Sequence, residues 1–112
     1  MAKKEIQTKS TGVRGEKMTD TAEELSVLRE EINRIDRDIL RLFEERMDVS
    51  RRVAAYKLAH SMPVLDAARE AEVIASRGNL AQAGNKEYAE CLFRCIMEQS
   101  RTEQEKLIEA QK

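Results

Sequence analysis

The fold is decided by residues 21–60, which read TAEELSVLREEINRIDRDILRLFEERMDVSRRVAAYKLAH. Apolar side chains recur along this stretch at steps of three or four residues, with one step of seven across position 46. These side chains are Leu25, Leu28, Ile32, Ile35, Ile39, Leu42, Val49, Val53 and Tyr56. The spacing is a heptad seam, which is typical of a helix that packs lengthwise against another helix. Because no glycine or proline interrupts the seam between Thr21 and Pro63, the pattern predicts one unbroken helix over about 21–60.

A helix of this length cannot be covered by the remainder of its own chain. About 40 residues make a helix roughly 60 Å long at 1.5 Å per residue. A compact domain of ~94 residues is only ~32 Å across. The simplest cover for the seam is a second copy of the same helix, which predicts a two-fold homodimer.

The remaining chain predicts two shorter helices. Asp66 follows the break at 61–63 and can cap a helix over about 67–81, although Gly78 could end that helix early. A third helix is predicted after Gly84, over about 86–110. The sequence therefore predicts an all-α chain of one long, one short and one medium helix. Two such chains would interlock into an intertwined homodimeric bundle.

Composition limits the functions that this chain can have. The chain has 112 residues, a formal net charge of −1, one histidine and two cysteines. The balanced charge argues against a general nucleic-acid binder, and no apolar run approaches the ~20 residues of a membrane span. One histidine and two cysteines are too few for a four-ligand zinc site, and His60 would be the sole imidazole base. If the chain is an enzyme, we expect it to work without a metal, a covalent nucleophile or an imidazole.

The N-terminal residues and the cysteines indicate where the chain acts. Residues 1–18 are polar and aperiodic, which predicts a mobile extension before a helical domain at 19–112. A nucleic-acid-binding arm is an alternative that the few, mixed charges disfavour. The extension lacks the apolar core of a secretory signal. We expect Cys91 and Cys95 to be reduced, partly buried thiols, which favours a cytoplasmic location.

One charge stands in the seam where an apolar residue is expected. Arg46 lies between Leu42 and Val49, and it could set the register of the helix pair or extend its charged end to solvent. Lys57 follows 11 residues later. At that spacing a helix returns to within about 20° of the same face, so two cations face one side. Arg29 is roughly 25 Å before Arg46, so it could join them only from an antiparallel partner chain.

The two shorter helices carry further polar side chains. Asp66, Arg69 and Glu70 open the second helix, and Ser100 and Gln104 share one face of the third. Capping, surface charge or ordinary hydrogen bonding would explain each residue separately. Together with the cations of the long helix, they predict a polar pocket with excess positive charge, which suits a small dianion.

Several separated stretches resemble the all-helical (AroQ-class) chorismate mutases. These are LREEINRID at 28–36, LFEER at 42–46, VAAYK at 53–57, PVLDAARE at 63–70 and IMEQSRTEQ at 96–104. The resemblance covers about residues 21–108. It implies a cytoplasmic homodimer with two shared active sites and no cofactor, which isomerises chorismate to prephenate in the shikimate pathway to phenylalanine and tyrosine. Because no second enzyme domain is evident, we expect a monofunctional chorismate mutase.

The resemblance also implies a catalytic role for Lys57, Gln104, Arg46 and Glu70. Arg46 and the partner chain's Arg29 would bind the two substrate carboxylates. Lys57 and Gln104 would donate hydrogen bonds to the ether oxygen of the bond that breaks. Since a Claisen rearrangement is pericyclic, no proton transfer is needed. The protein would restrain the substrate in its compact form, and each donor to the developing charge would supply roughly 3 kcal/mol.

Further residues complete the implied site. Asp66 and the catalytic Glu70 would hold the region of the substrate hydroxyl, Arg69 would support them, and Ser100 would lie near a carboxylate. An isochorismate pyruvate-lyase of the same fold is one alternative, although its relatives generally lack this pattern. A non-enzymatic helical dimerisation or regulatory module is the other, with Arg46 acting only as a specificity device.

Overall fold

The computed structural model describes residues 21–112, and this part of the chain is all-α, as predicted. In chain order its elements are α2 (Thr21–Ala59), α3 (Ala67–Leu80), the short 3-10 helix η1 (Ala83–Asn85) and α4 (Lys86–Ala110). The described residues contain no strand. The predicted extension at 1–18 and the predicted domain boundary at 19 lie outside the described residues.

The end of α2 is set by a left-handed residue. Ser61 has φ 54°, and only Met62 separates it from Pro63, which cannot continue a helix. The backbone N–H of Met62 donates to the Lys57 carbonyl at 2.8 Å, and that of Ser61 donates to the Leu58 carbonyl at 3.3 Å. These two bonds form a Schellman motif, which satisfies carbonyls that the helix end leaves unpaired.

The start of α3 is capped by the residue that the sequence predicted. The Asp66 carboxylate accepts from the backbone N–H of Arg69 at 3.0 Å. The prediction that Gly78 could end the helix early is wrong, since α3 continues to Leu80. A Cβ atom at Gly78 would lie 2.6 Å from Cγ of Glu90 on α4. The glycine therefore allows α3 and α4 to approach closely.

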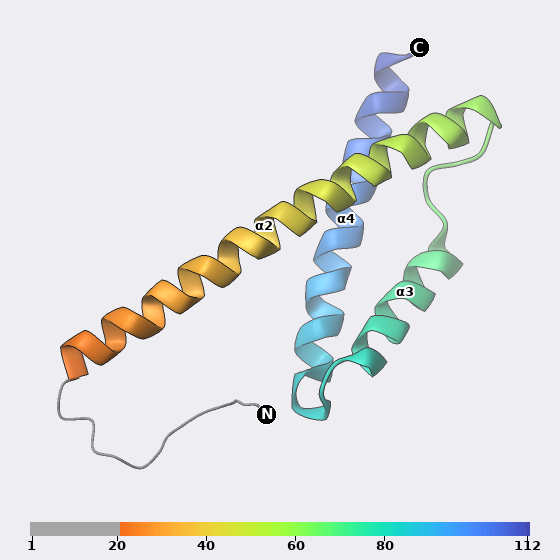
Figure 1. The fold of residues 1–112 in the computed structure, drawn as a ribbon. Helices are drawn as coiled ribbons and strands as arrows, with labels where there is room; N and C mark the ends of the chain where they lie inside the picture. Colours follow the sequence, from red (N-terminus) through yellow and green to blue (C-terminus); the bar gives the residue numbers. More distant parts are fainter. Residues whose placement is uncertain (1–20) are drawn as a thin grey trace. The chain divides into compact units, whose positions relative to one another are not determined.

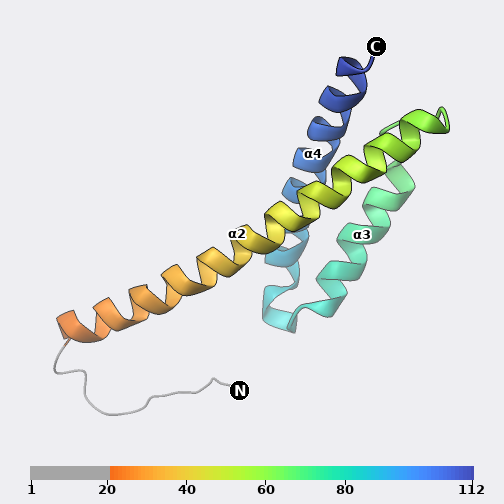
Figure 2. The same cartoon turned by 45° about the horizontal axis from the view of Figure 1, so that its top comes forward.

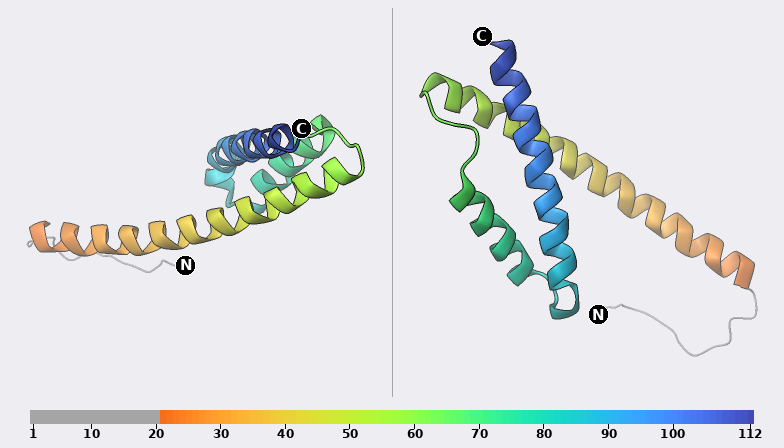
Figure 3. Two further views of the ribbon diagram at one scale, coloured as in Figure 1. Left: turned by 90° about the horizontal axis from the view of Figure 1, so that it is seen from above. Right: turned by 180° about the vertical axis from the view of Figure 1, so that it is seen from behind.

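The chain divides into two compact units, of which one ends at Leu40 and the other comprises Arg41–Lys112. Within the second unit, α3 and α4 lie side by side and antiparallel, joined through η1 (Figures 1 and 2). The part of α2 that belongs to this unit crosses α4, as the view from behind also shows (Figure 3). This crossing brings the functional side chains together.

The core of the described chain is unusually polar. Its buried apolar side chains are Ala54 and Val73, whereas its buried polar side chains are Ser50, Ser100 and Gln104. Polar groups are buried at a cost unless they are hydrogen-bonded, so such a core needs a closed set of partners.

The heptad seam of α2 is exposed in the single chain. All nine seam residues are accessible, from 38% for Val53 to 57% for Ile39 and Tyr56. Cys91 and Cys95 are also exposed, which corrects the expectation of partial burial, because no described side chain covers them. None of the helices in the described part is long and apolar enough to cross a membrane.

Candidate active site

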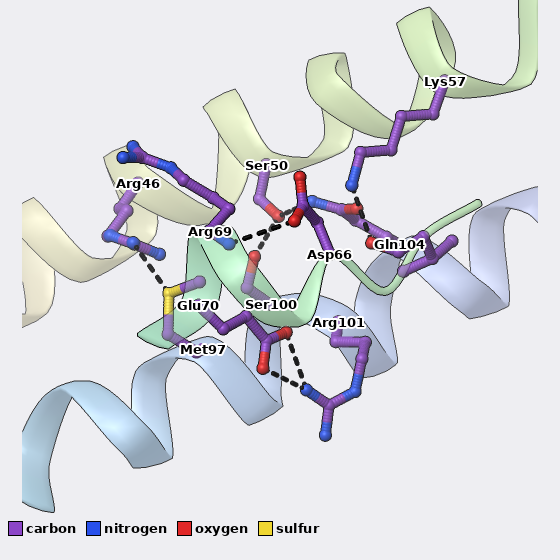
Figure 4. A network of polar contacts seen from close by, with 11 residues as sticks. Arg46, Ser50, Lys57, Asp66, Arg69, Glu70, Met97, Ser100, Arg101 and Gln104 are labelled. Atoms are coloured by element: carbon purple, nitrogen blue, oxygen red, sulfur yellow. Dashed lines mark hydrogen bonds and ion pairs between the residues drawn. The ribbon is translucent and has the colours of Figure 1, made fainter. Parts of the chain in front are cut away.

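Six of the eight predicted site residues line one pocket in the unit Arg41–Lys112. The pocket has a volume of about 50 Å³, and its walls come from α2, the connection before α3, α3 and α4. The lining residues are Lys57, Val64, Asp66, Arg69, Glu70, Met97, Ser100, Arg101 and Gln104. Figure 4 shows most of these side chains converging between the helices. The structure thus collects residues that lie far apart in the sequence.

Lys57 ties the connecting segment to the end of α2. Its Nζ donates to the backbone carbonyl of Val64 at 2.7 Å, while two further N–H bonds of the ammonium are available to a ligand. Asp66 uses Oδ1 for its helix cap and leaves Oδ2 available. Both residues therefore combine a structural contact with a free polar group in the pocket.

Arg46 lies next to the pocket without lining it. Its Nη2 donates to Sδ of Met97 at 3.4 Å, and Met97 is itself a lining residue. Burial lowers the pKa of the Arg46 guanidinium, and the charges of Arg77 and Arg69 lower it further. A cation held among other cations gains stability when an anion binds beside it. The surroundings of Arg46 therefore favour an anionic ligand.

Glu70 and Arg101 both line the pocket and form an ion pair with each other. Nη1 of Arg101 donates to both carboxylate oxygens of Glu70, at 2.8 and 2.7 Å. Hydrogen bonding to Glu70 is the main reason why the pKa of Arg101 is raised. Each oxygen of Glu70 keeps a second lone pair, so the carboxylate can still accept from a ligand hydroxyl. Arg69 instead pairs with Glu72 near the surface.

A buried hydrogen-bonded cluster links α2 to α4. The hydroxyl groups of Ser50 and Ser100 are hydrogen-bonded to each other, and Nε2 of Gln104 donates to Oγ of Ser50 at 2.8 Å. Figure 4 shows the three side chains meeting at the crossing of the two helices. Ser100 and Gln104 line the pocket, whereas Ser50 lies behind them.

The sequence reasoning missed two of these residues. Ser50 lies four residues after Arg46 and seven before Lys57, so the same helical periodicity could have identified it. Arg101 stands in a quoted motif without an assigned role, and only the packing of α3 against α4 reveals its partner Glu70. Arg29 lies on α2 in the unit that ends at Leu40, and its role stays a prediction. Among the described residues, no group of three or more His, Cys, Asp or Glu side chains could hold a metal ion.

Comparison with known proteins agrees with the resemblance read from the motifs. Residues 28–105 match the family described as chorismate mutase type II. A bifunctional chorismate mutase/prephenate dehydratase from Buchnera aphidicola subsp. Acyrthosiphon pisum (strain APS) is 33% identical over 86 residues, which are 75% of this chain and 22% of that protein. The protein of the same description from Buchnera aphidicola subsp. Schizaphis graminum (strain Sg) is 32% identical over 87 residues, 76% of this chain and 23% of its own.

This chain thus spans less than a quarter of the length of these relatives. No solved structure matches it. The family match covers well over half of the chain, including the whole pocket and the parts of α2 and α4 that hold the Ser50 cluster. The chain therefore belongs to the type II chorismate mutase family.

Proposed function

We propose that this chain catalyses the Claisen rearrangement of chorismate to prephenate, a step in the formation of phenylalanine and tyrosine. The observation that carries the proposal is the pocket, in which Lys57 of α2 and Gln104 of α4 both present hydrogen-bond donors. The adjoining cation Arg46 would suit a dicarboxylate substrate. Family membership and the names of the relatives support the same reaction.

In the proposed mechanism, substrate binding supplies most of the restraint. Arg46 and the partner subunit's Arg29 bind the two carboxylates, which holds the ring and the enolpyruvyl group in the compact, near-attack form. Lys57 and Gln104 donate to the ether oxygen, on which negative charge develops as the carbon–oxygen bond breaks. Each such donor is preorganised and lowers the barrier by roughly 3 kcal/mol. No step requires a proton to be transferred.

The remaining residues would orient the substrate. Asp66 and Glu70 accept from the substrate hydroxyl, with Arg69 close by on the first turn of α3. Ser100 donates to a carboxylate. The ion pair between Glu70 and Arg101 holds the Glu70 carboxylate in the pocket wall.

The site is proposed to be shared between two chains in an interlocked homodimer. Ligand sites generally begin near 300 Å³, whereas the pocket of the single chain is about 50 Å³. The exposed seam of α2 provides an apolar surface that a second copy would cover. A cytoplasmic location also belongs to the proposal, and the unpaired thiols of Cys91 and Cys95 are consistent with it.

The direct test is to add the purified chain to chorismate, follow the loss of chorismate absorbance and identify the product. Formation of prephenate is expected, and its absence would reject the proposal. Conversion of isochorismate to salicylate and pyruvate would identify the lyase instead.

Gln104→Ala should lower kcat/KM by about 10²-fold or more, in line with loss of one transition-state donor. Gln99→Ala, at an exposed glutamine of the same helix, is the matched control and should leave activity unchanged.

The shared site has its own test. Arg29→Ala and Lys57→Ala should each be inactive, since each removes one contact from both sites of a homodimer. Refolding the two variants together should restore about one intact site per mixed dimer, while each variant refolded alone stays inactive. Mixed dimers that form without recovering activity would contradict the assignment of Arg29 to the partner's site.

A further inference from the structure

Three buried polar side chains occupy the centre of the helix crossing. Ser50 is 5% exposed, Ser100 6% and Gln104 7%. Buried hydroxyl and amide groups lose water on folding, so each must find a partner within the protein. Ser50 is the member that touches both others, through its hydroxyl group. Its position therefore fixes how the other two use their hydrogen-bonding groups.

The chemistry of the amide gives this cluster a direction. An amide nitrogen donates and does not accept, so the bond from Gln104 uses a lone pair of the Ser50 oxygen. A hydroxyl oxygen has two lone pairs, so this bond leaves both the proton and the second lone pair of Ser50 for its hydrogen bond with Ser100, in which either hydroxyl can donate. The direction is fixed only for the bond from the Gln104 N–H to the Ser50 oxygen.

The amide of Gln104, which lines the pocket, keeps a second N–H that this bond does not use. With the opposite amide orientation, Ser50 would donate to the carbonyl oxygen of Gln104, and both N–H groups of the amide would lack this anchor. The observed bond to Ser50 thus anchors one N–H of the amide, and the second N–H is the group that can donate to the substrate.

We infer that Ser50 is a positioning residue, which orients the Gln104 amide so that its second N–H can donate to the substrate. The inference rests on the proposed mutase function and deepens it, since it names a residue outside the pocket that orients a residue inside it. Ser50 itself does not line the pocket, so it acts only through its neighbours. Loss of its hydroxyl would leave a buried N–H of Gln104 unpaired and free the amide to rotate.

The first experiment measures kinetics of Ser50→Ala. Misorientation of a transition-state donor should lower kcat by about tenfold, with a much smaller change in KM. Val73→Ala is the control, because it removes buried apolar contacts away from the pocket and should lower Tm while kcat is retained. A kcat of Ser50→Ala equal to that of the unaltered chain would overturn the inference.

The second experiment replaces the Gln104 amide with a carboxyl group, which titrates. In Gln104→Glu, the side chain can donate to the ether oxygen only when it is protonated, so the rate should rise as the pH falls. A Ser50 hydroxyl that donates to the carboxylate stabilises the charged form. Adding Ser50→Ala should therefore move the midpoint of this profile upward by about one pH unit. A midpoint that does not move would show that Ser50 does not act on the side chain at position 104.

A third measurement needs no activity. The side-chain amide protons of Gln104, assigned in NMR spectra by their loss in Gln104→Ala, should exchange at unequal rates, because Ser50 holds one of them. In Ser50→Ala both should exchange rapidly. Equal, rapid exchange in the unaltered chain would overturn the inference. If chorismate is not converted at all, the proposed function fails, and this measurement still decides whether Ser50 orients Gln104.

Discussion

Arg46 is a seam residue whose charge is unfavourable for the folded chain alone. Burial and the neighbouring charges of Arg77 and Arg69 lower the pKa of its guanidinium. Arg46→Met keeps an unbranched, flexible side chain, although a shorter one, and removes this charge. We therefore expect a Tm that is unchanged or higher, together with a fall of about 10²-fold or more in kcat/KM, because a carboxylate contact is lost.

The matched control for this variant is Arg52→Met. Arg52 lies on the same helix, pairs with Asp48 at the surface and has a side chain 73% exposed. It should leave both kcat/KM and Tm close to their starting values. If Arg46→Met retained full activity, Arg46 would serve the helix seam alone.

The donors of the proposed site predict a flat pH profile. Gln104 is an amide and does not titrate. The lowered pKa of Arg46 disfavours its charged form, and the raised pKa of Arg101 favours it. Arginine titrates so far above neutrality that both keep their charge between pH 6 and 8. Accordingly, kcat/KM and the contribution of these two residues to stability should both stay nearly constant over this range. A steep fall in kcat/KM would point to a different, titrating donor.

A site residue could be predicted from the sequence only where its residue type and its position along a helix indicate its role. Lys57 and Arg46 were found because helical periodicity places them on one face. Ser50 obeys the same periodicity but is small and uncharged, so nothing in its residue type drew attention to it. The pairing of Glu70 with Arg101 depends on how two helices pack, which no local spacing encodes.

At the level of the helices, Gly78 offers a test of close packing. Alanine is about 1 kcal/mol better than glycine within a helix. At this position its Cβ would meet the Glu90 side chain at 2.6 Å, and that side chain is tied to Lys86. Gly78→Ala alone should therefore gain little or lose stability. In a Glu90→Ala background the same change should stabilise the chain by up to about 1 kcal/mol. Chemical denaturation of the four proteins measures this cycle, and equal effects in both backgrounds would contradict it.

The helices themselves were almost fully predictable, because the signals that set them are local. The predicted ranges 21–60, 67–81 and 86–110 compare with Thr21–Ala59, Ala67–Leu80 and Lys86–Ala110. Gly78 misled the prediction, since a glycine that ends a helix and one that allows close contact look alike in sequence. The Schellman motif after α2 was also hidden, because Ser61 occupies the place usually taken by glycine.

For the molecule as a whole, the proposed homodimer would make stability depend on association, because the second chain would cover the exposed seam. Folded chains that associate are stabilised by mass action, so the midpoint of thermal unfolding should rise with protein concentration. Ile32→Asp, which places a charge in the seam, should favour the monomer and abolish this dependence. Arg34→Asp, at an exposed position on the same helix, controls for added charge and should leave the dependence intact. Sedimentation equilibrium gives the state of each variant, and a midpoint independent of concentration in an unaltered dimer would contradict the expectation.

The polar core has a calorimetric consequence. Exposure of apolar surface raises the heat capacity on unfolding, whereas exposure of polar surface lowers it. Ala54 and Val73 contribute little apolar surface, and Ser50, Ser100 and Gln104 act in the opposite direction. A monomeric seam variant should therefore unfold with a heat-capacity increment well below the usual ~12–15 cal/mol/K per residue, a value that the associated chain should approach. The free energy of unfolding of this variant would accordingly vary only weakly with temperature and would fall little on cooling.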